Sequence, residues 1–156
     1  MNAFERLKEI IQALNEENVD YVLFGGQAVN LYGILRFTED IDLFVSPTAE
    51  NVARIRRALR LIWQDPAVDE ILVEDLAGEY AVVRYGTPDG FYIDFVSRLD
   101  DVFRFEDIEH QAIALGDIHA KVATPRMLYR MKSQTTRPID GADALDLKAK
   151  FHLEDE

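Results

Sequence analysis

Three aspartates lie in or beside short apolar runs, and their placement restricts the fold of this chain more than any other feature. Asp40 and Asp42 flank Ile41 at the start of the run 41–45, which alternates as a β-strand does. Both carboxylates therefore point to the same face. Asp94 lies inside the run 91–96, where a carboxylate is costly to bury without a partner. If this strand pairs near 40–45, the three carboxylates form one cluster.

Neighbouring carboxylates repel one another, so a cation is expected between Asp40 and Asp42. The chain has no cysteine, which excludes thiolate metal sites and disulfides. An all-oxygen site suits Mg²⁺, with Mn²⁺ as the alternative ion. The competing interpretation is that Asp40 and Asp42 are solvated residues at the edge of a strand, without an ion.

A glycine pair, Gly25-Gly26, follows the β-branched and aromatic run 19–24 and precedes a short helix predicted for 27–32. Such a turn lets backbone N–H groups approach a phosphate closely. By itself the pair fits an ordinary tight turn better. Thirteen residues separate it from Asp40, and this spacing, together with Asp42 and Asp94, makes a phosphate-binding turn the stronger prediction.

The remaining pattern alternates helices and strands, and predicts an α/β (α+β) fold with a small mixed β-sheet packed by helices. We expect one domain over 1–156, with a core of about 1–122 and a helical C-terminal segment of about 123–156. Residues 67–78 are ambiguous, and 106–115 fit either a helix or a strand. The other expected elements are an amphipathic helix over 2–18, a helix capped by Ser46 with Pro47 at its first position and running to about 63, hairpin strands over 80–85 and 91–96, a strand over 118–122, a helix from Thr124-Pro125 to about 134, and a last helix capped by Asp140 that ends near 151.

Acidic residues outnumber basic ones by 29 to 17, which gives a net charge of −12. This balance argues against a general nucleic-acid binder, which usually carries excess positive charge to neutralise phosphates. The N-terminus lacks the layout of a signal peptide, and no apolar run approaches the roughly 20 residues of a membrane span. We therefore expect a cytoplasmic protein without membrane contacts.

Two motifs carry a resemblance to a known family. The first is Phe24-Gly25-Gly26 followed by Arg36-x-Thr38-x-Asp40-x-Asp42, and the second is Lys132 followed by Arg137-Pro138-x-Asp140-x-x-Asp143. Together they resemble the DNA polymerase beta-like nucleotidyltransferases, and more narrowly the minimal bacterial enzymes that include toxin-antitoxin and abortive-infection toxins. The resemblance spans roughly residues 20 to 150, so it implies a nucleotidyltransferase fold for nearly the whole chain.

The resemblance also implies roles for the acidic residues and the glycines. Gly25 and Gly26 would hold the triphosphate of a nucleoside triphosphate (NTP). Asp40 and Asp42 would bind the metal ion that bridges the nucleotide. Asp94 would help to bind a second ion and would activate the acceptor hydroxyl, as in two-metal displacements.

Three more residues receive nucleotide-binding roles from the same resemblance. Arg36 and Thr38 would orient the loop or contact phosphate, although Arg36 equally fits an ion pair with a neighbouring carboxylate. Lys132 would reach the phosphates from a C-terminal helix, with an ordinary surface lysine as the alternative. Many members of the superfamily have serine after the first glycine, where this chain has Gly26, so a hydroxyl contact to phosphate is missing.

The predicted reaction is transfer of a nucleoside monophosphate from an NTP to an acceptor hydroxyl. We expect a toxin-like enzyme acting on tRNA or on a protein, with an antitoxin protein as a partner. One alternative is a small-molecule enzyme of the aminoglycoside type, which the acidic charge favours because a cationic acceptor would be attracted. The other alternative is a degenerate fold that binds a nucleotide or a partner protein without catalysis.

Overall fold

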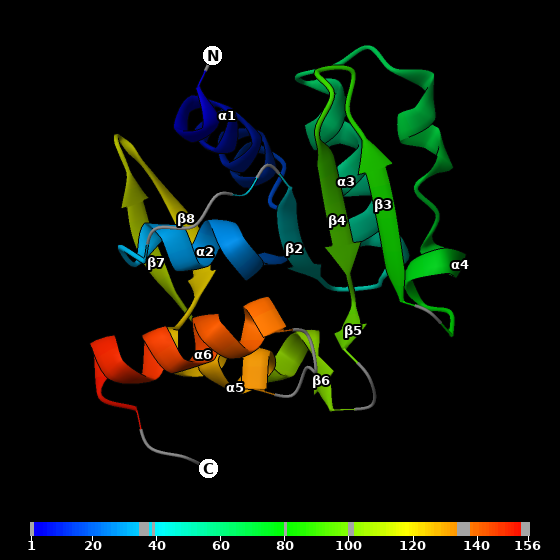
Figure 1. Ribbon diagram of the computed structural model, residues 1–156. Coiled ribbons are helices and arrows are strands. Elements are labelled where there is room, and N and C mark those ends of the chain that lie inside the picture. Colours follow the sequence, from blue (N-terminus) through cyan, green and yellow to red (C-terminus); the bar gives the residue numbers. More distant parts are fainter. Residues whose placement is uncertain are drawn as a thin grey trace.

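A six-stranded mixed sheet forms the centre of the computed structural model, which describes residues 2–34, 38, 40–79, 81–99, 102–133 and 138–153, without the side chains of 133 and 138–143 (Figure 1). The strand order is β3-β4-β2-β1-β8-β7. These strands are β1 (Tyr21–Phe24), β2 (Ile41–Val45), β3 (Val82–Gly86), β4 (Tyr92–Val96), β7 (His110–Leu115) and β8 (Ile118–Ala123), and a small separate pair consists of β5 (Arg98–Leu99) and β6 (Phe103–Arg104). The predicted mixed α/β fold is confirmed.

The sheet combines antiparallel and parallel pairs around the central strands β1 and β2. These two strands are antiparallel to one another, β4 runs parallel to β2, and β8 runs parallel to β1. The hairpin of β3 and β4 and the hairpin of β7 and β8 close the two edges. The predicted 80–85 and 91–96 hairpin is therefore present, and the ambiguous segment 106–115 contributes the edge strand β7.

Helices and short helical turns bury the apolar residues of the sheet. The helices are α1 (Ala3–Glu16), α2 (Gly25–Leu31), α3 (Ala49–Arg60), α4 (Val73–Leu76), α5 (Pro125–Ser133) and α6 (Pro138–Phe151), with 3₁₀ turns at Pro66–Glu70 and Phe105–Asp107. Helix α1 packs on α3, while α5 packs on α6 and contacts α2. In Figure 1, α5 and α6 lie together at the end of the molecule opposite α1. None of the helices in the described part of the chain has the length and apolar character needed to cross a membrane.

Two predicted helix caps are wrong. Helix α3 is capped by Thr48 and not by Ser46, because the Thr48 side chain accepts a hydrogen bond from the Asn51 backbone N–H. Helix α6 begins at Pro138, so Asp140 lies inside the helix and does not cap it. A proline suits the first turn of a helix, where its missing N–H has no partner to lose. The predicted Thr124 cap of α5 is confirmed by its bond from the Met127 N–H.

Candidate active site

The strand register places two of the predicted carboxylates side by side. Asp42 on β2 and Asp94 on β4 are direct neighbours across the parallel pair. Asp40 immediately precedes β2, and its side chain is 42% exposed, against 15% for Asp94. The apolar residues of the same strands, such as Ile41 and Ile93, are buried on the other face. The alternation of each strand therefore turns the acidic side chains out of the core and into one pocket.

A cation already lies among these carboxylates, and it is the guanidinium of Arg84. Arg84 faces Asp94 across the antiparallel β3–β4 pair and donates from Nε to Oδ1 at 2.8 Å and from a terminal nitrogen to Oδ2 at 3.0 Å. The same terminal nitrogen reaches Asp40 Oδ2 at 3.4 Å. These bonds to Asp94, followed by its charge, raise the pKa of Arg84 above the ordinary arginine value. The sequence predicts a cation at this cluster, and an arginine fills that role in the structure.

The donor set fits a divalent ion in chemistry, but the side chains are not arranged around one. Carboxylate oxygens are the ligands that Mg²⁺ prefers, and the pairing of β2 with β4 supplies them from neighbouring strands. Within the described ranges, however, no group of three His, Asp or Glu side chains could hold a metal ion in its present conformation. Both oxygens of Asp94 are bonded to Arg84 instead.

The glycine pair lies against the same carboxylates, and each glycine is fixed by a close neighbour. Gly25 has φ +71°, and a Cβ on it would lie 2.2 Å from Asp42 Oδ2, so no side chain fits there. A Cβ on Gly26 would lie 3.1 Å from both Cβ and Oγ1 of Thr38. The absence of a serine at position 26 therefore has a local reason, because Thr38 occupies the adjoining space.

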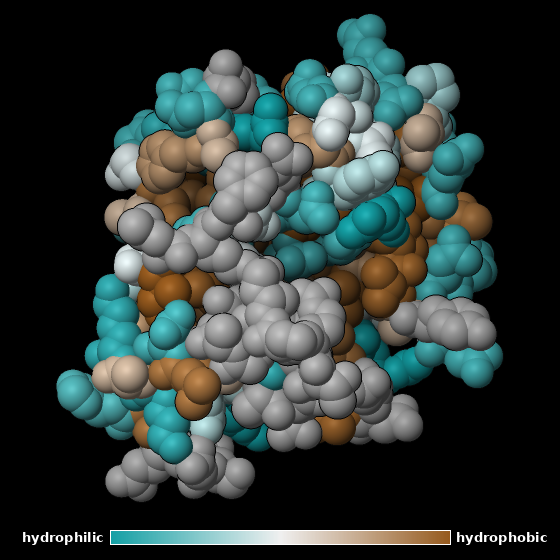
Figure 2. Space-filling model, viewed as in Figure 1, coloured by the Kyte–Doolittle hydropathy of each residue, from teal (hydrophilic) through white to brown (hydrophobic). Residues whose placement is uncertain are grey.

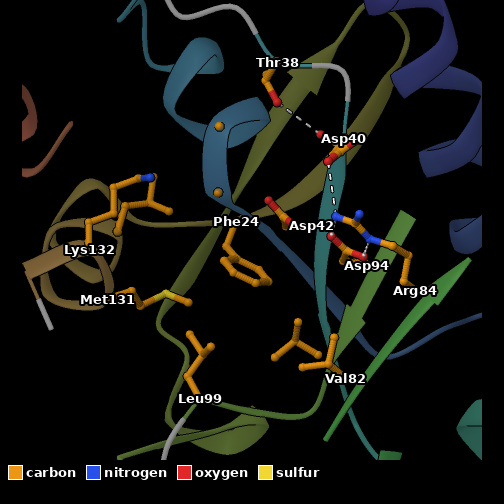
Figure 3. Close-up of a pocket in the computed structure, with 14 residues that line it drawn as sticks. Phe24, Thr38, Asp40, Asp42, Val82, Arg84, Asp94, Leu99, Met131 and Lys132 are labelled. Atoms are coloured by element: carbon orange, nitrogen blue, oxygen red, sulfur yellow. Dashed lines mark hydrogen bonds and ion pairs between the residues drawn. The ribbon is translucent and has the colours of Figure 1, made fainter. Parts of the chain in front are cut away.

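These residues line a cavity of about 520 Å³ between the sheet and the C-terminal helix α5. The pocket combines two kinds of wall, with the carboxylates and Arg84 on the sheet side and Lys132 across from them (Figure 3). Apolar and hydrophilic side chains also adjoin one another on the face shown in Figure 2. The apolar part of the wall consists of Phe24, Val82, Val96, Leu99, Leu128 and Met131.

Lys132 is 6% exposed and lines the pocket, so the alternative of an ordinary surface lysine is wrong. The pocket also contains Gly25, Gly26, Thr38, Asp40, Asp42 and Asp94. Arg36 lies outside the described residues. Arg84 lines the pocket as well, and the sequence reasoning missed it. The available signal was its strand position, which the hairpin register sets directly opposite Asp94.

Two known structures, one of them of a nucleotidyltransferase-like protein, have a similar fold. JHP933 from Helicobacter pylori superposes with a TM-score of 0.56 at 19% identity, over 95% of this chain and 65% of that protein. The chain thus spans about two thirds of the length of that protein. An antigenic nucleotidyltransferase-like protein from Paracoccidioides brasiliensis superposes with a TM-score of 0.55 at 17% identity, over 93% of this chain and 75% of that protein.

At these identities the structural matches establish the fold alone. No curated protein sequence matches the chain significantly. The family model described as the nucleotidyl transferase AbiEii toxin of a type IV toxin-antitoxin system matches residues 7–132, which is most of the chain. This match includes every residue of the pocket described above. The chain therefore belongs to the AbiEii nucleotidyl transferase toxin family.

Proposed function

We propose that this protein transfers a nucleoside monophosphate from an NTP to an acceptor hydroxyl in a Mg²⁺-dependent reaction. The observation that carries the proposal is the register of β2 and β4, which sets Asp42 beside Asp94 in the pocket that also contains the glycine turn. The family, described as nucleotidyl transferase toxins, supports the same chemistry.

In the proposed reaction the acceptor oxygen attacks the α-phosphorus while the bond to the pyrophosphate oxygen breaks and pyrophosphate leaves. Asp94 accepts the hydroxyl proton, since its side chain is less exposed than that of Asp40. Asp40 and Asp42, with Asp94, would hold the divalent ions, which stabilise the attacking and leaving oxygens when bound. Mn²⁺ is the alternative ion.

The glycine turn beside Asp42 and the lysine across the pocket are suited to hold the triphosphate. Gly25 and Gly26 have no side chains to block a phosphate that approaches their backbone, and the Thr38 hydroxyl lies beside Gly26. Thr38 thereby offers a hydroxyl near the place where a serine at position 26 would offer one. Lys132 supplies a positive charge from α5. Arg36 stays a proposed phosphate contact or ion-pair partner.

The contribution of Lys132 also supports treating residues 1–156 as one functional unit. Core strands and the C-terminal helix α5 line the same pocket, so neither part would hold the nucleotide alone. The family description further supports a toxin role with an antitoxin partner. The acceptor we propose is the hydroxyl of a tRNA or of a protein side chain, as expected for a toxin-like enzyme.

The direct test uses NTPs labelled at the α-phosphate, Mg²⁺, and three acceptor pools: total tRNA, a cellular protein extract, and a mixture of aminoglycosides. We expect label on tRNA or on protein, and none when Asp42→Asn replaces the wild type. Label on aminoglycosides alone would favour the small-molecule alternative instead. NTP binding without label in any pool would favour the non-catalytic alternative.

A further inference from the structure

Arg84 holds its carboxylates in a way that an ordinary surface ion pair does not. Its guanidinium binds both oxygens of Asp94 at 2.8 Å and 3.0 Å and reaches Asp40 at 3.4 Å. Two parallel N–H···O bonds to one carboxylate are the strongest arrangement that an arginine makes. Arg84 therefore brings a positive charge from β3 to the cluster of carboxylates and neutralises part of its negative charge.

A divalent ion and this guanidinium need the same oxygens. Mg²⁺ binds carboxylate oxygens at about 2.1 Å and demands near-octahedral geometry. With both Asp94 oxygens already accepting from Arg84, an ion bound to Asp94 would meet a like charge at van der Waals distance. The two positive charges therefore compete for Asp94.

The surroundings of Arg84 permit the exchange. Its side chain is 53% exposed and lies on the edge strand β3, so no packed layer confines it. The guanidinium carbon lies 4.5 Å from the ring centroid of Tyr92, which projects from β4 and is 44% exposed. This cation–π contact supports the guanidinium next to the carboxylates and gives it a place to remain after it releases Asp94. Figure 3 shows the guanidinium beside Asp94 and Asp40.

We propose that Arg84 is a built-in counter-ion that competes with the divalent metal for Asp94, so that metal binding requires the guanidinium to leave this carboxylate. The inference rests on the proposed function, because it takes the carboxylates as the metal site. It makes Arg84 a positioning residue, which keeps the carboxylates in place before loading and sets the metal concentration at which loading occurs.

Nucleotide-free titration calorimetry with Mn²⁺ and with Mg²⁺ tests the competition directly. Arg84→Gln removes the charge and the fork of donors, and we expect its metal affinity to rise about five- to tenfold above that of the wild type. Arg54→Gln is the matched control, because Arg54 pairs with Glu50 on α3 and does not line the pocket. Its metal affinity should equal that of the wild type. An unchanged or weaker affinity in Arg84→Gln overturns the proposal.

Thermal unfolding with and without Mn²⁺ supplies a second readout. Without metal, Arg84→Gln should melt at a lower temperature than the wild type, since its carboxylates have lost their counter-ion. The metal-induced rise in melting temperature should be larger than in the wild type. If Arg84→Gln does not fold without metal, Arg84→Lys replaces it: the charge stays but the fork is lost, so its metal affinity should lie above that of the wild type.

The outcomes also separate this inference from the proposed function. If wild type and Arg84→Gln both bind no metal, even with an NTP present, the metal site fails and the inference fails with it. If wild type binds metal and transfers label while Arg84→Gln shows no gain in affinity, only the competition is refuted.

Discussion

Two neighbouring residues of β3, Arg84 and Tyr85, each contact a carboxylate, but on opposite sides of the strand. Arg84 faces the pocket and binds Asp94 and Asp40. Tyr85 faces the other way, is 4% exposed, and donates from its hydroxyl to Asp65 Oδ2 at 2.7 Å. The Tyr85 contact is thus part of the packed structure, whereas the Arg84 contact lies in the pocket.

The polar groups around Tyr85 form hydrogen bonds with one another and with the neighbouring backbone. The second oxygen of Asp65 accepts the Ala67 N–H and so caps the turn at Pro66–Glu70. The Trp63 ring packs 6.0 Å from the Tyr85 ring, and its indole N–H donates to Asp89. Each polar atom thus has its own protein partner. At Arg84, one guanidinium is shared between two carboxylates, and a third carboxylate, Asp42, lies beside them. That concentration of acidic side chains distinguishes the pocket.

The largest expected effect comes from Asp42→Asn, which removes one charge from the pocket and keeps the side-chain volume. The transfer rate should fall about a thousandfold or more, because the variant loses a ligand for the ion that stabilises the transition state. The free energy of unfolding should change by about 1 kcal/mol or less, since asparagine keeps the volume and one hydrogen-bonding oxygen. Initial rates with α-labelled NTP, together with urea unfolding, measure both quantities. A large loss of stability would show that Asp42 serves the fold, as Asp65 does.

Gly25→Ala should damage the pocket through geometry instead of charge. Its Cβ would lie 2.2 Å from Asp42 Oδ2, and φ +71° is unfavourable for alanine. We expect the transfer rate to fall about a hundredfold, because Asp42 must move. The stability loss should be about 1–2 kcal/mol. The same two assays apply, and near-normal activity would contradict the close approach of Gly25 to Asp42.

Tyr85→Phe is the opposite test, on the structural side of β3. Loss of the hydroxyl leaves Oδ2 of the partly buried Asp65 without its hydrogen-bond donor, which should lower the free energy of unfolding by about 1–2 kcal/mol. The transfer rate should stay within about twofold of wild type, since the ring still fills its place. Urea unfolding and the labelled-NTP assay check the two parts, and a tenfold drop in rate would link the two faces of the strand.

The same variant gives a pH prediction. Burial, followed by the hydrogen bond to Asp65, raises the pKa of Tyr85 above its ordinary value of 10.0. The unfolded chain would therefore lose this proton first, so the contribution is intact below about pH 10 and is lost as pH rises beyond it. Unfolding free energy should fall more steeply above pH 10 in wild type than in Tyr85→Phe. Tyr21, whose pKa is raised to about 12 by burial, is present in both proteins and contributes equally to both slopes. Parallel slopes in the two proteins would therefore refute the contribution of Tyr85.

A smaller loss than in Gly25→Ala is expected for Gly26→Ser, which introduces the residue common in the wider superfamily. Its Cβ would press against Thr38, so activity should fall only a few-fold as Thr38 shifts. Combining it with Thr38→Ala should recover most of the loss, because the new hydroxyl gains the vacated space. Labelled-NTP kinetics on the two single variants and the double variant measure the coupling. Additive losses would show that the two residues do not share this space.

The sequence predicted the parts of the fold that depend on local periodicity. The alternation around Asp42 and the apolar run around Asp94 identified β2 and β4, and in β4 the exposed Tyr92 alternates with the buried Ile93. That β2 and β4 lie side by side, however, depends on tertiary pairing, which the sequence allows but does not determine. The cap of α3 was misplaced for a similar reason, since Ser46 and Thr48 can both serve as caps and only the chain path selects Thr48.

The pocket shows the same limit. The sequence did not distinguish a surface lysine from a pocket lysine at position 132. The burial of Lys132 depends on how α5 packs near the sheet, which the residues of the helix alone do not determine. Arg84 was missed because an arginine on an exposed strand position looks like an ordinary solvated residue. Only the β3–β4 register, which sets Arg84 opposite Asp94, reveals its partner.

The central claim is transfer of a nucleoside monophosphate by the carboxylates of this pocket. The most direct measurement compares ATP labelled at the α-phosphate with ATP labelled at the γ-phosphate, in wild type and in Asp42→Asn, with Mg²⁺ and the acceptor pools. Label should reach the acceptor from the α-position only, the γ-label should appear in pyrophosphate, and Asp42→Asn should give neither. Transfer of the γ-label to the acceptor, or undiminished α-labelling by Asp42→Asn, would contradict the claim.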